Sequence, residues 1–357
     1  MSDQQRAPLW RTFTPGTMPK GAGVRWVWDE RLPRGQISFL GGSAGVGKSV
    51  LVWGLAFSVA AGRPFLDAET DQGRVLYLDF DSEPEAQGEL MHRVRRGLGI
   101  APNAVEDAIT YRVPHTIGRS MSTDMLDDLR EEIQRGDYAL VIVDAWTSAF
   151  YTVRSNDTEQ VAAMMGALRS LTVPTDHGPG PNVLIVDHAP KPIQNGPSML
   201  ERGIIGSTMK LAGARSAFLL ARVPPKDVQG RDVMALHALK NNLARVHDPV
   251  GVQRDWNNEA GSVVQSVTDL PEAETGAPGM RRAQQVIRES LDPEDWVARK
   301  QLLLNIVQRA NVQERTALSA LARMVQDGIV VLQTDEQDRR RKLYRLAGTF
   351  PAREDAL

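Results

Sequence analysis

Apolar runs alternate with amphipathic segments along most of the chain, from residue 26 to about residue 267. Short apolar runs in this region predict strands at 36–40, 74–80, 140–143, 183–186, 217–220 and 234–239. Several of these runs are continuously apolar, which is typical of strands that are covered on both faces. Strands that alternate with helices indicate a mostly parallel sheet with helices on both sides. We therefore expect an α/β domain over residues 25–267.

A second pattern follows a break at residues 268–280, which are rich in Pro, Gly and acidic side chains and predict a linker. Beyond it, helices are predicted at 281–291, 298–310 and 314–326, and strands at 329–334 and 342–346. In the third helix, the residues Leu318, Leu321, Ala322 and Val325 repeat at helical spacing, so we expect them to face a core. Helices followed by a hairpin resemble a winged helix-turn-helix domain, here over residues 281–347.

The winged-helix interpretation gives a role to the basic side chains of this region. Arg315, Ser319 and Arg323 are expected on the exposed side of the third helix, which would be the recognition helix. The charged turn between the two strands carries Arg339, Arg340, Arg341 and Lys342. Such a wing can contact phosphates, so we expect duplex DNA binding here. A winged helix that binds another protein, with a merely solvated turn, is the alternative.

Residues 42–49 read Gly-Ser-Ala-Gly-Val-Gly-Lys-Ser and match the phosphate-binding pattern G-x-x-x-x-G-K-[ST] at every fixed position. This loop follows a predicted strand and precedes an apolar helix. In that arrangement, backbone N–H groups of the loop and the N-terminus of the helix point toward the phosphates. Lys48 would reach the β- and γ-phosphates, and the Ser49 hydroxyl would bind Mg²⁺. We therefore expect a nucleoside triphosphate, bound by Gly42, Ser43, Ala44, Gly45, Val46, Gly47, Lys48, Ser49 and Val50.

An acidic residue ends the apolar run at 139–144, which reads Ala-Leu-Val-Ile-Val-Asp. Asp144 would hold Mg²⁺ through its water shell, as the Walker B acid of P-loop proteins does. Ala145 and Trp146 follow it instead of a second acid. This disfavours ATPases that place the water-activating glutamate directly beside this aspartate. The chain also lacks the N-K-x-D motif that reads guanine.

The water-activating carboxylate is then expected at another strand end, and residues 74–83 supply candidates. Asp79 and Asp81 share a strand face because side chains alternate with a period of two. With this run, the chain resembles the RecA-like ATPases of the plasmid RepA helicase type, which are related to the replicative hexameric helicases. That family carries its catalytic glutamate at the position of Asp81. Aspartate is one methylene shorter, so Glu83, which could reach in from the turn, stays open as a second candidate.

The resemblance covers residues 25–265 and implies further site residues. His188 stands where the family has a histidine that senses the γ-phosphate, although Asp187 replaces the first member of a frequent histidine pair. Arg215 lies in a segment similar to the one that supplies an arginine finger to the neighbouring subunit. Lys240 occupies the first position of the strand-end basic pair of replicative helicases. Asn242 stands in place of the second basic residue, for which Arg245 is a possible substitute.

The function that this resemblance implies is an ATP-dependent DNA helicase of the plasmid or phage type, acting as a homo-oligomeric ring, as in hexameric relatives. Loops at 150–156 and 191–202, including Lys191, are candidates to contact single-stranded DNA in a central channel. Two other functions stay open. One is an ATP-controlled DNA-binding regulator or helicase loader with slow hydrolysis, which the aspartate in place of glutamate favours. The other is a RecA-type recombination ATPase.

The amino-acid composition limits how the chain can contact DNA and in which compartment we expect it. The 357 residues contain 42 Lys plus Arg against 44 Asp plus Glu, so DNA contacts must come from local basic patches. Cys is absent, which excludes disulfides and Cys-ligated zinc and suits a reducing cytosol. The N-terminus lacks the apolar core of a signal peptide, and the most apolar stretch, 50–61, is too short to span a bilayer. We expect a cytoplasmic protein without membrane contact, with a flexible arm at 1–24 and a tail at 348–357.

Overall fold

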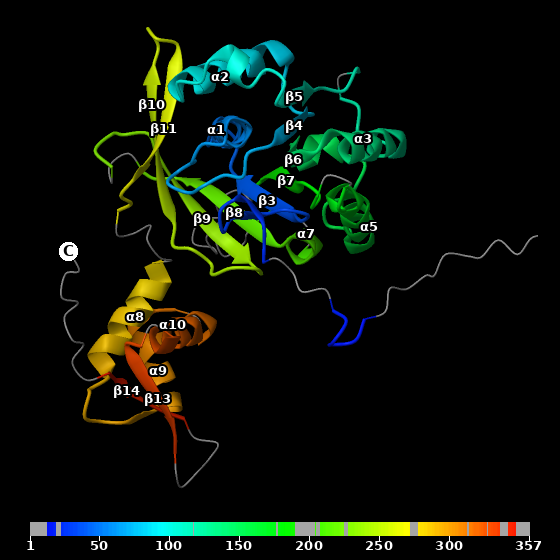
Figure 1. The fold of residues 1–357 in the computed structure, drawn as a ribbon. Helices are drawn as coiled ribbons and strands as arrows, with labels where there is room; N and C mark the ends of the chain where they lie inside the picture. The colour runs from blue at the N-terminus through cyan, green and yellow to red at the C-terminus, as the bar shows by residue number, and fades with distance from the viewer. Residues whose placement is uncertain are drawn as a thin grey trace, which may run out of the picture.

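The structure is a computed structural model. It describes residues 13–18, 23–116, 118–175, 178–189, 204, 208–224, 228–271, 278–312, 314–326, 328–335 and 342–347. Within these residues, the largest sheet has nine strands in the order β11-β10-β9-β8-β3-β7-β6-β4-β5 (Figure 1). They are β3 (Ile37–Gly42), β4 (Arg74–Asp79), β5 (Ile109–Arg112), β6 (Tyr138–Asp144), β7 (Asn182–His188), β8 (Ser216–Arg222), β9 (Val233–Asn241), β10 (Val250–Asn257) and β11 (Ser262–Thr268).

Strand direction divides this sheet into two parts. From β8 through β3, β7, β6 and β4 to β5, each strand runs parallel to its neighbours. From β8 to β11, each pairing is antiparallel. The mostly parallel α/β sheet predicted from the sequence is therefore confirmed, and each predicted strand of this domain overlaps an observed one. A short ribbon of β1 (Trp26–Trp28) and β2 (Leu32–Pro33) lies outside this sheet.

Helices cover both faces of the sheet (Figure 1). On one face, α1 (Lys48–Ala61) packs in the core with α2 (Pro84–Gly97) outside it. On the other face lie α3 (Thr123–Gly136), α4 (Trp146–Ala149), α5 (Thr158–Arg169) and α7 (Thr208–Gly213), with short 3₁₀ turns at Pro102–Ala104 and Ser170–Thr172 elsewhere in the domain. Because α1 is apolar around most of its circumference, it is buried between sheet and helix along nearly its whole length. This fixes the phosphate loop, which joins α1 to β3.

The C-terminal part has its own hydrophobic core. It consists of α8 (Pro278–Ser290), β12 (Val297–Ala298), α9 (Arg299–Ala310), α10 (Glu314–Gln326), β13 (Val330–Thr334) and β14 (Lys342–Leu346). The three strands form an antiparallel sheet in the order β12-β14-β13. α8 begins at Pro278, inside the segment that was predicted to be a linker, because proline fits the first turn of a helix.

The buried face of α10 agrees in part with the predicted one. Of the predicted residues, Leu321 is buried, Leu318 and Val325 are partly buried against the same core, and Ala322 is exposed. The fully buried residues are Ala317, Ala320, Leu321 and Met324. Both sets repeat at helical spacing, and the observed set is turned by one residue. Alanine carries little hydrophobic signal in a sequence, but its small side chain lets α10 approach α8 and α9 closely. Among the described residues, every helix is too short or too polar to cross a bilayer.

Candidate nucleotide-binding site

The phosphate loop connects the end of β3 to the start of α1. Gly45 and Gly47 have φ angles of 70° and 99°, a left-handed conformation that glycine adopts without steric cost. The loop can therefore turn sharply, and α1 begins immediately after it. Gly47 is the N-cap residue and gives no side-chain cap, so the first N–H groups of α1 are available to a ligand. These donors at a helix N-terminus favour an anion such as phosphate.

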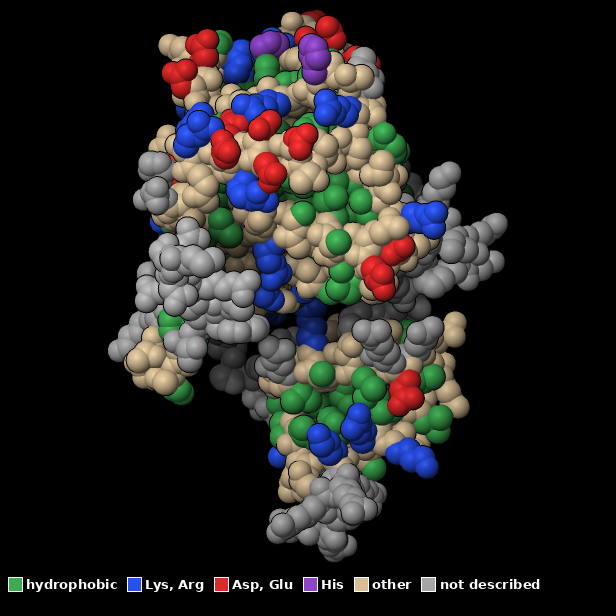
Figure 2. Space-filling model, turned by 90° about the vertical axis from the view of Figure 1, so that its right-hand side faces the viewer, with side chains coloured by type: hydrophobic (Ala, Val, Ile, Leu, Met, Phe, Trp, Pro, Cys, Tyr) green, Lys and Arg blue, Asp and Glu red, His purple; other side chains and the backbone are tan. Residues whose placement is uncertain are grey.

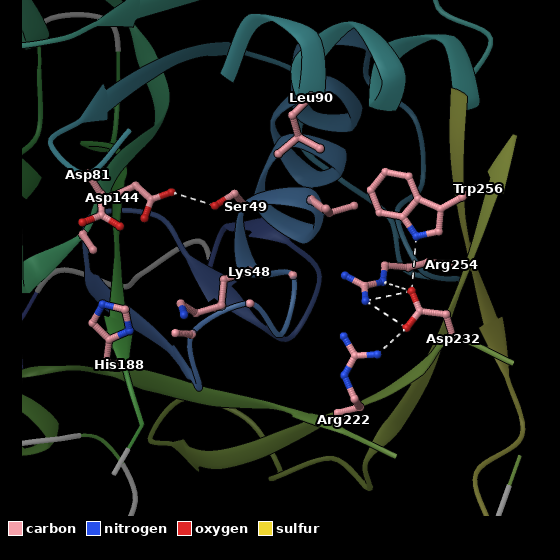
Figure 3. Close-up of a pocket in the computed structure, with 15 residues that line it drawn as sticks. Lys48, Ser49, Asp81, Leu90, Asp144, His188, Arg222, Asp232, Arg254 and Trp256 are labelled. Atoms are coloured by element: carbon pink, nitrogen blue, oxygen red, sulfur yellow. Dashed lines mark hydrogen bonds and ion pairs between the residues drawn. The ribbon is translucent and has the colours of Figure 1, made fainter. Parts of the chain in front are cut away.

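Lys48 places its ammonium inside this loop (Figure 3). Its Nζ donates hydrogen bonds to the carbonyl oxygens of Gly42 at 2.9 Å and Ser43 at 3.1 Å. Desolvation by burial lowers the pKa of Lys48, although nearby carboxylates, Asp144 first among them, oppose this effect. The side chain is only 8% exposed. A buried cation among backbone donors is the arrangement that a phosphate chain requires.

Ser49 and Asp144 meet across the cleft from different elements. The Ser49 hydroxyl donates to Asp144 Oδ2 at 3.4 Å, and the Tyr77 hydroxyl donates to the same oxygen at 2.7 Å. Desolvation by burial raises the pKa of Asp144 to about 6. Among the described residues, no group of three or more His, Cys, Asp or Glu side chains is placed to hold a metal alone. One carboxylate and one hydroxyl fit Mg²⁺, which is usually completed by phosphate and water.

The structure separates the carboxylates of the β4 end. Asp79 is 1% exposed and accepts hydrogen bonds from the backbone N–H groups of Asp81 and Ser82 and from the Tyr111 hydroxyl. The Asp79 carboxylate therefore stabilises the turn that follows β4 from its buried side. Asp81 lines the cleft, and its Oδ1 accepts the Ser148 hydroxyl at 2.6 Å. Glu83 is exposed at the start of α2 and is outside the cleft lining.

This geometry predicts that Asp81 and Glu83 respond differently to mutation. We expect Asp81→Asn to lower ATP turnover by about a hundredfold or more while ATP binding is kept, because a positioned base typically contributes that factor. Glu83→Gln should keep ATP turnover within about twofold of the parent value, which is a small change compared with the loss expected for Asp81→Asn. Steady-state phosphate release and equilibrium ATP binding measure both effects. The reverse result would assign the role to Glu83, and normal turnover in both variants would show that neither residue activates water.

His188 ends β7 and lines the same cleft. Its neighbour Asp187 is fully buried and forms an ion pair with Lys210 Nζ at 2.8 Å, while its other oxygen accepts the His188 backbone N–H. The Lys210 ammonium also lies 4.5 Å from the ring centroid of Trp146. The aspartate that departs from the histidine pair of the resembled family therefore ties the end of β7 to α7.

Arg215 and Lys240 are absent from the lining of this cleft. Lys240 Nζ donates to the carbonyl oxygens of Leu211 at 2.6 Å and Ala214 at 2.8 Å, near the C-terminal end of α7. A cation at that end of a helix is favourable in itself. Arg215 follows α7 and pairs through its backbone with β3 and Asn242. Neither residue is placed to act on the nucleotide of its own chain.

The predicted DNA contacts are only partly described by the structure. Lys191, Arg339, Arg340 and Arg341 lie outside the described residues, as does the side chain of Arg315. Arg323 forms an ion pair with Asp248, which precedes β10, so its guanidinium is engaged within the chain. Ser319 is exposed on α10, and Lys342 is exposed at the start of β14.

The cleft has a second half that sequence reasoning missed (Figure 3). Its total volume is about 490 Å³, which is within the range of small-molecule sites. The missed lining residues are Leu90, Arg222, Asp232, Arg254 and Trp256. They come from α2 and from the antiparallel part of the sheet. No fixed motif links them in the sequence, since their proximity depends on how β8, β9 and β10 pair.

A family model described as an AAA domain matches residues 15–194. The matched segment contains the phosphate loop, Asp81, Asp144 and His188. The curated proteins include no match to the chain.

Proposed function

The chain belongs to the AAA domain family, and from this premise we propose that it is an ATP-driven motor on DNA, a helicase of the plasmid or phage RepA type. One observation carries the proposal. Lys48 and Ser49 at the start of α1, Asp81 after β4 and Asp144 at the end of β6 line one cleft around a phosphate loop. A lysine, a hydroxyl and carboxylates in this arrangement hold and hydrolyse nucleoside triphosphates in P-loop ATPases.

In the proposed mechanism, Lys48 binds the β- and γ-phosphates of ATP. Ser49 and Asp144 would hold Mg²⁺, which would neutralise phosphate charge. Asp81 accepts a proton from a water molecule, whose oxygen attacks the γ-phosphorus. The bond from this phosphorus to the β-phosphate oxygen breaks, and ADP leaves with the electron pair. His188 donates a hydrogen bond to the γ-phosphate and Lys48 stabilises the charge that develops on it.

The C-terminal part supports DNA as the partner. Its described residues supply α8, α9, α10 and a three-stranded sheet, which are the elements of a winged helix. Figure 2 shows Lys and Arg side chains beside hydrophobic ones on this part, together with an acidic side chain, and both signs of charge on the larger part. Lys342 is exposed here. Clustered cations bind phosphates, so we place the duplex contact on this domain and the single strand in the channel of a ring.

Assembly into a homo-oligomeric ring is part of the proposal. Arg215 is outside the cleft of its own chain, which is what a finger that serves a neighbouring subunit requires. Lys240 is engaged with carbonyl oxygens near the end of α7, so Arg215 is the better finger candidate.

The test is ATP turnover with and without single-stranded DNA, together with unwinding of a forked duplex. We expect turnover to rise severalfold with single-stranded DNA and the fork to open only when ATP and Mg²⁺ are present. A non-hydrolysable ATP analogue should support DNA binding but not unwinding. If the rate of ATP turnover is the same with and without DNA, and no unwinding occurs at any protein concentration, the helicase proposal is contradicted.

A second candidate is an ATP-controlled DNA-binding regulator or loader. It is favoured by Asp81, which is a shorter side chain than the glutamate of the resembled family and is already hydrogen-bonded to Ser148. In that case turnover should be slow and unaffected by DNA, while ATP should change the affinity for duplex DNA. The same assays therefore separate the two functions.

A further inference from the structure

An ion-pair network lies in the half of the cleft away from the hydrolytic carboxylates (Figure 3). Asp232 is at its centre. Its carboxylate accepts hydrogen bonds from Arg254 Nε at 2.9 Å and Nη2 at 3.0 Å. Arg222 Nη1 donates to it at 2.9 Å, and Trp256 Nε1 at 3.2 Å. One carboxylate thus fixes side chains from β8 and β10 at the rim of the phosphate loop.

Arg254 reaches from this network to the loop itself. Its side chain is only 6% exposed, although it lines the cleft. The guanidinium contacts Gly47, and a Cβ atom at that position would overlap Nη1. A side chain at position 47 would therefore displace the Arg254 guanidinium, in addition to straining the left-handed backbone of Gly47. Among the described residues, Nη1 has no hydrogen-bond acceptor, while Nε and Nη2 are both bonded to Asp232.

This arrangement leaves one guanidinium nitrogen directed at the phosphate loop. Arginine carries only donors, so an unused donor at an anion-binding loop calls for a negatively charged acceptor. Asp232 neutralises one of the two arginines, Arg222 and Arg254, so the network keeps a net positive charge beside the loop. Because Asp232 fixes the opposite edge of the guanidinium, little orientational freedom is lost when the free edge binds a phosphate oxygen.

The position of Arg254 also indicates which phosphate of the nucleotide it can contact. Asp81, Asp144 and His188 lie on the opposite side of the loop, where the γ-phosphate must be for hydrolysis (Figure 3). Arg254 lies beside Trp256 and across from Leu90, where apolar surface suits the base and ribose. Its free nitrogen therefore faces the α–β end of the phosphate chain.

We propose that Arg254 is a phosphate-binding residue that β10 supplies to the nucleotide of its own chain, with Asp232 as its positioning residue. Arg254 contacts the α- or β-phosphate of the nucleotide, on the side of the loop opposite the hydrolytic carboxylates. This inference rests on the proposed function, because it needs a nucleoside triphosphate at residues 42–49.

Calorimetric titration with ATP and with ADP, each with Mg²⁺, tests the inference. Arg254→Gln should weaken the binding of both nucleotides by a similar factor of roughly tenfold to a hundredfold, the range for a lost hydrogen bond to a charged group. Arg231→Gln is the matched control: Arg231 is exposed beside Asp232, bonds to Gln253 and Thr268, and is outside the cleft lining. This control should bind both nucleotides like the parent.

A double variant removes the two main ambiguities. Asp232→Asn/Arg254→Gln also removes the carboxylate that loses its Arg254 partner in the single variant, so it should fold even where the single variant does not, and its net charge equals that of the parent. We expect it to lose ATP and ADP affinity like Arg254→Gln, which a long-range charge effect would not produce. Parent affinity in a double variant with a normal melting temperature would overturn the inference. So would a loss confined to ATP, since that would place the contact at the γ-phosphate.

Failure of the proposed function gives a different result. If the parent binds neither nucleotide, or if Lys48→Ala binds both normally, the nucleotide site itself is wrong and the inference falls with it. If binding depends on Lys48 while the Arg254 variants bind normally, the inference alone is overturned.

Discussion

Replacing Lys48 with alanine is expected to lower ATP turnover by at least about a hundredfold, because this ammonium offsets charge that develops on the transferred phosphate. Its Nζ already lies inside the phosphate loop, bonded to the carbonyl oxygens of Gly42 and Ser43. ATP binding should also weaken, since the side chain meets the β- and γ-phosphates. Phosphate release at saturating ATP measures the first effect, and equilibrium titration the second.

The control for this prediction is Lys300→Ala, which removes an exposed lysine of α9 and should leave turnover unchanged. Thermal melting must show that Lys48→Ala is folded. We expect a modest loss of stability, because the variant loses hydrogen bonds within the loop and the buried methylene groups of one side chain. Parent turnover in a folded Lys48→Ala protein would remove the argument that residues 42–49 form the active site.

The hydrolytic half of the cleft could be predicted because its signals are local. The phosphate loop needs glycines at fixed positions, and Gly45 and Gly47 do take left-handed conformations. Asp81 and Asp144 follow apolar runs, and the carboxyl ends of parallel strands meet at one sheet edge. Local rules therefore place the carboxylates beside the loop, although they do not choose between Asp81 and Glu83.

The other half could not be predicted, because it depends on long-range pairing. Asp232 and Arg254 meet because β9 and β10 are antiparallel, with Val233 opposite Gln253. An arginine in an alternating strand pattern reads as a solvent-facing residue, whereas Arg254 is buried against Gly47. Only the register of β10 gives it that position.

The strands that the sequence pattern missed have a related explanation. β5 is only partly buried, so its residues lack the continuous apolar run that marks the central strands. β10 and β11 carry polar side chains such as Gln253 and Gln265, and β11 is the edge strand of the sheet, with β10 beside it. Edge strands expose one side and therefore resemble surface segments in sequence. The cleft nevertheless depends on β10 for Arg254 and Trp256.

Replacing Lys210 with methionine is expected to lower the free energy of unfolding by about 3–5 kcal/mol, the cost of leaving one partner of a buried ion pair alone. Asp187 and Lys210 are 0% and 1% exposed, so the carboxylate loses the ammonium at a site without contact with bulk water. Burial already raises the pKa of Asp187, and Lys210 opposes that rise. Without Lys210 the pKa of Asp187 in the folded protein should rise further above its value in the unfolded chain.

The sign of the pH dependence follows from this difference in pKa. Between the unfolded and folded pKa values of Asp187, the folded variant binds more protons than the unfolded chain, so its stability falls as the pH rises. The deficit of Lys210→Met relative to the parent should therefore be larger at pH 8 than at pH 5. Urea unfolding at both pH values measures it.

The double variant Asp187→Asn/Lys210→Met provides the control, because it removes both charges and keeps an oxygen that can accept the His188 backbone N–H. Replacing both members of a buried ion pair is often nearly neutral, so we expect most of the stability to return and the extra pH dependence to disappear. A single variant as stable as the parent would show that water or another group compensates the carboxylate. A double variant as unstable as the single one would show that Lys210 acts through contacts other than the Asp187 ion pair, such as the one with the Trp146 ring.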